Sequence, residues 1–250
     1  MAISISNITN NAALYQSANV AIAKRGNAAT DPLGAANQRI EQQLNSTNVK
    51  LSSFSQLKSS FADLQTAAKG LSDPLKTNTN TALTKAAQSF ASAFNTATNS
   101  VNSARDARNN GALANDSRAR SVGYDLKSIL ANGNNTSDLK KIGINLQANG
   151  TISVDNTTLQ NALQANPNAV KDTLARVGKQ AELVSTKELA TTGNVGGSVN
   201  ALSNLNNSLE TQLAEQKKLA SASQNAVQQQ GALFGNTSTA VASYLQTLAL

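Results

Sequence analysis

The stretch LKKIGINLQANGTISVD, residues Leu139 to Asp155, decides the fold class of this chain. Apolar and polar residues alternate on both sides of Asn149-Gly150, a period of two that is typical of a half-buried pair of strands. Most of the remaining chain has helical spacing. An isolated two-stranded ribbon is marginal in water, so we expect its apolar face to lie against helices. The apolar positions are Ile142, Ile144, Leu146, Ile152 and Val154.

The register of this hairpin follows from the numbering of its apolar residues. All five have even numbers, so they share one face only if opposed residues have an even sum. A two-residue Asn-Gly loop breaks this rule. A three-residue loop, Ala148 to Gly150 with Gly150 left-handed, satisfies it. The pattern therefore predicts that Ile144 and Val154 are cross-strand neighbours on a buried face.

Composition restricts the functions that the chain can have. Of its 250 residues, 40% are apolar and 3% aromatic, which favours long amphipathic helices over a dense globular core. The sequence contains no Cys and no His, so it lacks a thiol nucleophile, an imidazole base and the usual zinc ligands. No two carboxylates are spaced as an acid/base pair. We therefore predict a protein that is not an enzyme and that uses no cofactor or metal.

The net charge of +7 does not come from a basic cluster. No run of Lys or Arg is longer than two, and acidic residues are interleaved with the densest patch, which favours a solvated face over a nucleic-acid or membrane surface. The patch comprises Arg105, Arg108, Arg118 and Arg120, with Asp106 and Asp116 between them.

Neither a secretory signal nor a membrane span is visible in the sequence. The N-terminus lacks a basic start and an apolar core, and no segment approaches the roughly 20 apolar residues of a span. This pattern predicts a cytoplasmic protein, although export without a cleaved signal leaves the same trace.

Helical periodicity divides the chain into a few long elements. We expect a mainly α fold with a small β-hairpin, in which long N- and C-terminal helices pair as a coiled-coil stalk. The expected segments are a loosely ordered start (1–30), a stalk helix (31–74), a linker (75–84), a small α+β inner body (85–178) with its hairpin (139–155), a flexible loop (179–198), and a C-terminal stalk helix with an apolar tail (199–250).

Boundary signals refine these segments. Gly178 is a candidate helix C-cap, and Gly231 and Gly235 are expected to break the last helix. The helices over 39–71 and 199–230 are each about 50 Å long at ~1.5 Å per residue. Their equal lengths would let them pair side by side.

Apolar seams on the terminal helices are candidates for self-association. The same residues would also serve an intramolecular core, and spacing alone does not distinguish the two roles. The candidates are Leu51, Phe54, Leu57, Phe61, Leu209, Leu213, Tyr244, Leu245 and Leu248.

Four motifs between Phe90 and Leu174 carry a family resemblance. They are FASAFN (Phe90 to Asn95), GALANDSRARS (Gly111 to Ser121), the hairpin stretch, and LQNALQANPNAVKDTL (Leu159 to Leu174). Together they resemble the flagellar hook-associated protein 2 family, the filament cap proteins, in which these elements occur in the same order. The segments Leu51 to Pro74 and Ser243 to Leu250 also look like the family's N-terminal coiled coil and its C-terminal end.

The resemblance implies a structural protein of the bacterial flagellum. It implies export through the flagellar channel, an extracellular position at the filament tip, and three kinds of partner: flagellin, other hook-associated proteins and further copies of the chain. An export chaperone is a further possible partner. The chain departs from the family by having only residues 75–84 where family members carry large outer domains.

Two other functions stay open from the sequence. One is a hook-filament junction or flagellin-like subunit, against which the 139–174 hairpin and helix pair weighs. The other is a secreted binding module, for which an aromatic platform or carboxylate pair is missing.

Overall fold

The computed structural model describes the backbone of residues 31–73, 79–133 and 135–248, and side chains from residue 34 to residue 233 within these ranges. Two compact units make up the chain. The larger one, residues 46–206, is called the body here. The smaller one combines residues up to 45 with those from 207 onward, and is called the terminal unit.

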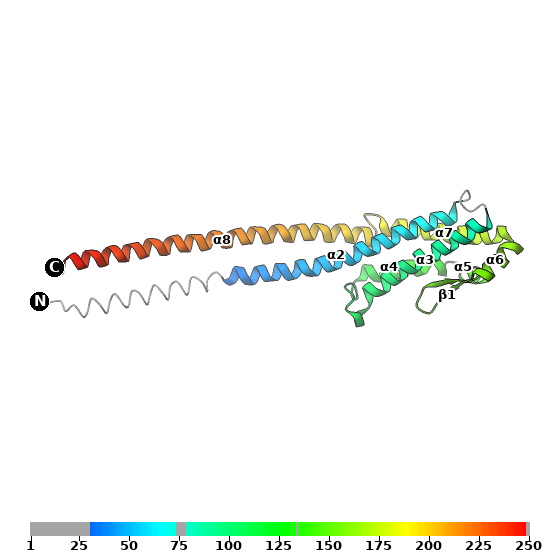
Figure 1. The fold of residues 1–250 in the computed structure, drawn as a ribbon, viewed down its shortest axis with the longest axis horizontal. Helices are drawn as coiled ribbons and strands as arrows, with labels where there is room; N and C mark the ends of the chain where they lie inside the picture. Colours follow the sequence, from blue (N-terminus) through cyan, green and yellow to red (C-terminus); the bar gives the residue numbers. More distant parts are fainter. Residues whose placement is uncertain (1–30, 74–78, 134, 249–250) are drawn as a thin grey trace. The chain divides into compact units, whose positions relative to one another are not determined.

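Helices dominate both units, as the sequence predicted, and two short strands form a single hairpin (Figure 1). The helices are α2 (Asp31–Ser72), α3 (Asn80–Arg105), the short 3-10 helix η1 (Ala107–Asn109), α4 (Ser117–Ala131), α5 (Asn135–Lys141), α6 (Asn156–Ala165), α7 (Pro167–Leu189) and α8 (Asn194–Leu248). The strands are β1 (Ile144–Leu146) and β2 (Ile152–Val154). Both long helices, α2 and α8, contribute to both units.

One hydrophobic core holds the body together. The aromatic face of α3, with Phe90 and Phe94, packs among apolar residues of α2, α4, α6 and α7. The predicted segment 85–178 lies inside this unit, to which the C-terminal part of α2, from residue 46, also belongs. The greater part of the long N-terminal helix is therefore built into the body.

The hairpin has the predicted register. Ile144 pairs with Val154 and Leu146 with Ile152, and the strands are antiparallel. Gly150 has a φ of +85°, so the three-residue loop with a left-handed glycine is confirmed. The Thr151 carbonyl accepts a hydrogen bond of 2.8 Å from the backbone N–H of Gln147 and closes the loop.

Two details of the hairpin prediction were wrong. Leu139 lies within α5, and Ile142 lies in the turn that follows this helix. The strands are therefore only three residues long. Leu146 is 50% exposed although it shares the face of buried Ile144 and Ile152, because the ribbon extends beyond the helices that cover it. Val154 is half-buried against the core.

Asn95 of α3 attaches the hairpin to the helices. Its side-chain amide donates to the Ile152 carbonyl at 2.8 Å and accepts from the Ile152 backbone N–H at 2.7 Å. A side-chain amide has the same donor and acceptor pair as a peptide group. Asn95 therefore takes the place of a third strand at the free edge of β2.

Several predicted boundaries were wrong because tertiary packing overrides local signals. The helix expected from Lys85 begins at Asn80, where the Thr79 side chain caps it. Gly178 does not end a helix; α7 continues to Leu189, and a Cβ at Gly178 would lie 2.8 Å from the Ala68 carbonyl oxygen. This glycine lets α7 approach α2 closely.

The C-terminal helix is longer than predicted. The expected loop over 179–198 is helical except for a short turn at 190–193, and α8 starts at Asn194. It continues through Gly231 and Gly235 to Leu248. Glycine lowers helix propensity by only about 1 kcal/mol, too little to break a helix of this length.

We expect Asn95→Ala to destabilise the body by about 2–4 kcal/mol, because both backbone groups of Ile152 lose their partner. The measurement is the free energy of unfolding in urea. Asn102→Ala is the matched control, since Asn102 makes one exposed hydrogen bond to the Asn149 carbonyl at the hairpin loop. Equal losses in the two variants would contradict the assigned role of Asn95.

Candidate functional site

The terminal unit buries little apolar surface. Within its described side chains, the buried apolar residues are Ile40 of α2 and Leu209 of α8. One ion pair joins its helices, Lys217 Nζ to Glu41 Oε1 at 3.1 Å, with both side chains about half exposed. Exposed pairs of this kind stabilise a protein by about 1 kcal/mol or less. The paired terminal helices that the sequence predicted are thus closed by a thin seam.

Polar atoms weaken this seam further. The side-chain oxygens Asn37 Oδ1 and Gln216 Oε1 are buried and have no hydrogen-bond partner in the described part of the chain. A buried polar atom without a partner costs about 1–3 kcal/mol. The cost of each unpaired oxygen is therefore about as large as the stabilisation from burying one apolar side chain.

Beyond the seam, α8 exposes every described side chain. From Ser221 to Leu233 no residue is even half-buried. Three large apolar residues lie on this part or next to it: Leu219 (62% exposed), Val227 and Leu233 (68% exposed). Leu219 and Leu233 are 14 residues apart, which is two heptads, so they lie close to one line along the helix. This line is an exposed apolar stripe on the described part of α8.

The predicted self-association residues fall into three groups. Phe54, Leu57 and Phe61 are buried in the core of the body, so these three serve the intramolecular core and are unavailable to another molecule. Leu51 is half-buried. In the terminal unit, Leu209 is buried and Leu213 is half-buried. The side chains of Tyr244, Leu245 and Leu248 lie outside the described residues.

A polar corner joins α7, α8 and α4, and sequence reasoning missed it. Glu188 is fully buried near the end of α7, where its Oε1 accepts a 3.0 Å hydrogen bond from Asn194 Nδ2 at the start of α8. Nearby, Lys187 Nζ lies 2.8 Å from Asp125 Oδ2 of α4. Asp125 and Glu188 are 63 positions apart, so no spacing rule brings them together.

The two carboxyls at this corner affect each other's ionisation. Burial, together with the neighbouring Asp125, raises the pKa of Glu188 to about 7. Burial alone would raise the pKa of Asp125, but hydrogen bonds from Glu188 and Lys187 lower it below its usual value. Asp125 also raises the pKa of Lys187. A buried Glu188 with a raised pKa thus lies beside Asp125, which pairs with Lys187.

Neither a metal site nor a membrane span is found in the part of the chain that the structure describes. No three side chains of the metal-binding types gather there. Among those residues, no helix combines the length and apolar content that crossing a bilayer requires.

The comparisons with known proteins agree with a structural role. The family described as flagellar hook-associated protein 2 C-terminus matches residues 75–238, more than half of the chain. The chain belongs to the flagellar hook-associated protein 2 family. Members of this family are structural proteins of the flagellum. A search of curated proteins finds no match.

The range that matches the family covers parts of both units. It includes the part of the body that follows α2 and most of α8. Exposed Leu219 and Leu233 lie on this part of α8. The apolar line on α8 therefore lies within the segment that matches the family.

The polar corner makes stability depend on pH. Between pH 4.5 and 7 the unfolded chain loses the Glu188 proton while the folded chain keeps it, so stability falls as pH rises through this window and levels off above it. We expect the free energy of unfolding in urea to be about 1–3 kcal/mol lower at pH 8 than at pH 5.5. With no His in the sequence, few other groups titrate in this range.

The variant Glu188→Gln checks the assignment, because a neutral amide stands in for the protonated acid. Its stability should be nearly constant from pH 5.5 to 8. Glu182→Gln, on the same helix, is the control and should keep the pH dependence of the parent. A parent-like slope in Glu188→Gln would show that another group is responsible.

Proposed function

We propose that this chain acts as a filament cap protein, which promotes the assembly of flagellin at the tip of the bacterial flagellum. The observation that supports this most directly is the uncovered part of α8 in a chain of the hook-associated protein 2 family. Such a surface suits a molecule that works as one copy among several.

The physical argument rests on the cost of an isolated helix. Helices of fewer than about 12–15 residues are marginal in water unless tertiary packing supports an apolar face. Ser221–Leu233 of α8 is 13 residues long and has no buried side chain. In the proposed assembly, neighbouring copies pack against Leu213, Leu219 and Leu233. The contact is heterologous, and repeated around an axis it closes into a ring.

The apolar tail extends this proposed surface. Tyr244, Leu245 and Leu248 continue the helical spacing of α8 and are proposed as further self-association residues. Leu51 is a weaker candidate on α2, where it is half-buried.

The partners follow from the capping role. We propose contacts with flagellin, with other hook-associated proteins and with further copies of the chain, and a chaperone that accompanies the chain before export. The protein would reach the outside of the cell through the flagellar channel without a cleaved signal peptide. The absence of Cys suits a chain that is exported unfolded and orders on assembly.

Self-association is expected to depend on the line along α8. The double variant Leu219→Asp, Leu233→Asp should lower the association constant of the purified chain by roughly 100- to 10,000-fold, because each substitution removes about 1.5–3 kcal/mol of apolar burial. The molar mass across a concentration series, from light scattering after gel filtration, gives this constant. Leu183→Asp is the control, since Leu183 is equally exposed (65%) but lies on α7 of the body.

A deletion strain tests the function itself. Loss of the gene should leave bare hooks and release flagellin into the medium as monomer, while normal filaments would rule out capping. Complementation with the parent or Leu183→Asp should restore filaments. The Leu219→Asp, Leu233→Asp variant should not.

A further inference from the structure

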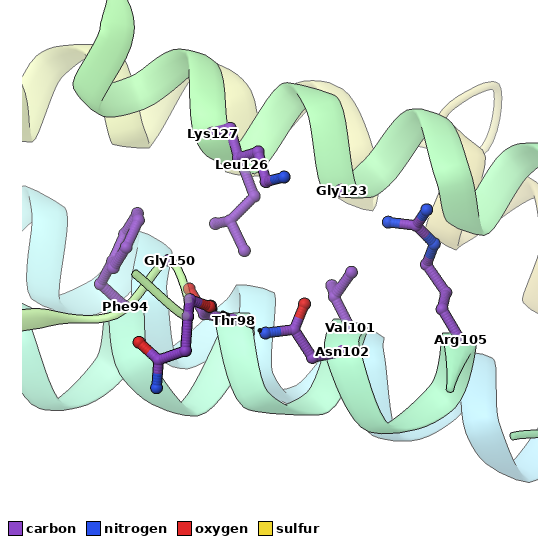
Figure 2. A pocket seen from close by; sticks show the side chains of 10 residues that line it. Phe94, Thr98, Val101, Asn102, Arg105, Gly123, Leu126, Lys127 and Gly150 are labelled. Atoms are coloured by element: carbon purple, nitrogen blue, oxygen red, sulfur yellow. Dashed lines mark hydrogen bonds between the residues drawn. The ribbon is translucent and has the colours of Figure 1, made fainter. Parts of the chain in front are cut away.

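A small cavity lies where α3, α4 and the hairpin loop meet (Figure 2). Its volume is about 20 Å³, which is room for one water-sized group such as a single oxygen atom. It is open on one side, and two of its lining residues are basic while none is acidic. The lining residues used below are Thr98, Asn102 and Arg105 of α3, Gly123 and Lys127 of α4, and Gly150 of the loop.

The hydroxyl of Thr98 has no partner in this cavity. Thr98 is only 6% exposed, and its Oγ1 is buried without a hydrogen bond to any described residue. Threonines within helices normally bond back to the carbonyl four residues earlier. On the same helix Thr84 and Thr96 do so, at 2.9 and 3.0 Å. Thr98, which lines the cavity, makes no such bond.

Arg105 brings an unpaired positive charge to the same place. Its half-buried guanidinium reaches α4 and packs on Gly123, where any Cβ would clash with Nη1 (Figure 2). No described residue forms an ion pair or hydrogen bond with Arg105 or with exposed Lys127. A guanidinium carries five donors, so a half-buried one normally pairs with an anion.

The nearby carboxylates are engaged elsewhere. Asp106 accepts hydrogen bonds from the Arg108 backbone N–H at 3.0 Å and from Asn109 Nδ2 at 2.6 Å, and so caps η1. Asp116 caps α4. Asp125 pairs with Lys187. The acidic residues interleaved in this basic patch thus stabilise helix ends and leave its cations without ion-pair partners.

The cavity is rigidly framed. Asn102 Nδ2 donates to the Asn149 carbonyl at 3.1 Å and fixes the loop over α3. A Cβ at Gly150 would lie 3.5 Å from the Thr98 methyl group, so the loop also packs on Thr98. The site therefore exists before any ligand binds, which reduces the entropic cost of binding.

We propose that this junction is a carboxylate site, which takes an acidic side chain presented by a partner protein. One carboxylate oxygen enters the cavity and accepts from the Thr98 hydroxyl, while the other lies between Arg105 and Lys127. The cavity admits one oxygen atom, so the remainder of the group lies outside it beside the two cations. This site adds a polar contact on the body, separate from the proposed α8 surface, and its test requires no filament assembly.

The test uses the full chain, labelled with ¹⁵N, and sodium acetate as the probe. Acetate replaces chloride at constant ionic strength and pH 7, and a parallel series uses inorganic phosphate. We expect saturable shifts at the amides of Gly123 and Gly150 and at Nε of Arg105. Thr98→Val should reduce the initial slope of these shifts by roughly ten-fold, the effect of losing one hydrogen bond to a charged group.

Two charge variants and a control complete the design. Arg105→Gln should abolish the response, and Lys127→Gln, at an exposed position, should reduce it even if Arg105→Gln fails to fold. Arg108→Gln, outside the cavity, should respond like the parent. A response that is linear and equal in all variants would overturn the proposal.

Two further outcomes would also overturn it. A saturable response to phosphate without one to acetate would show that the site does not select carboxylates. If Thr98→Val unfolds at a higher temperature than the parent and keeps the full acetate response, the cavity holds only a water molecule.

Discussion

The two hydrogen bonds between the Asn95 side chain and the backbone of Ile152 are the contact on which the body's architecture depends. Strands of three residues cannot form a stable ribbon by themselves. Asn95 satisfies both backbone groups of Ile152, while Ile144 and Ile152 bury their side chains in the core. Because α3 also packs on α4, α6 and α7, this one contact connects the hairpin to most of the helices.

The contrast between the two units explains how a structural protein can be both folded and ready to assemble. The body has a continuous core of Phe, Leu, Ile, Val and Ala side chains, to which six residues of α2 from Phe54 onward contribute with less than 2% exposure. The terminal unit buries few apolar side chains and also buries polar atoms that lack partners. Stability is therefore concentrated in the body, and the surface of α8 is left for other molecules.

The polar groups inside the body show where packing has brought distant charges together. Burial beside Asp125 raises the pKa of Glu188 to about 7, and its Oε1 accepts a hydrogen bond from Asn194 at the start of α8. This corner determines how α8 leaves α7. Elsewhere in the body, the Arg105 guanidinium and the Thr98 hydroxyl make no hydrogen bond or ion pair with a described residue, and the proposed carboxylate site rests on this feature.

The sequence by itself determined the features that arise from local periodicity. The period of two predicted the hairpin, and the parity of its apolar residues predicted the three-residue loop. The four ordered motifs predicted the family. In each case neighbouring residues carry the information, because backbone geometry links them directly.

Only the tertiary structure decided the rest. It showed that Phe54, Leu57 and Phe61 belong to the body's core, that Gly178 is a site of close helix contact, and that Leu146 is exposed. It also brought Glu188 to Asp125 and left the Thr98 hydroxyl unpaired. These outcomes depend on which elements pack against each other, and contacts between residues far apart in sequence leave no periodic trace in the chain.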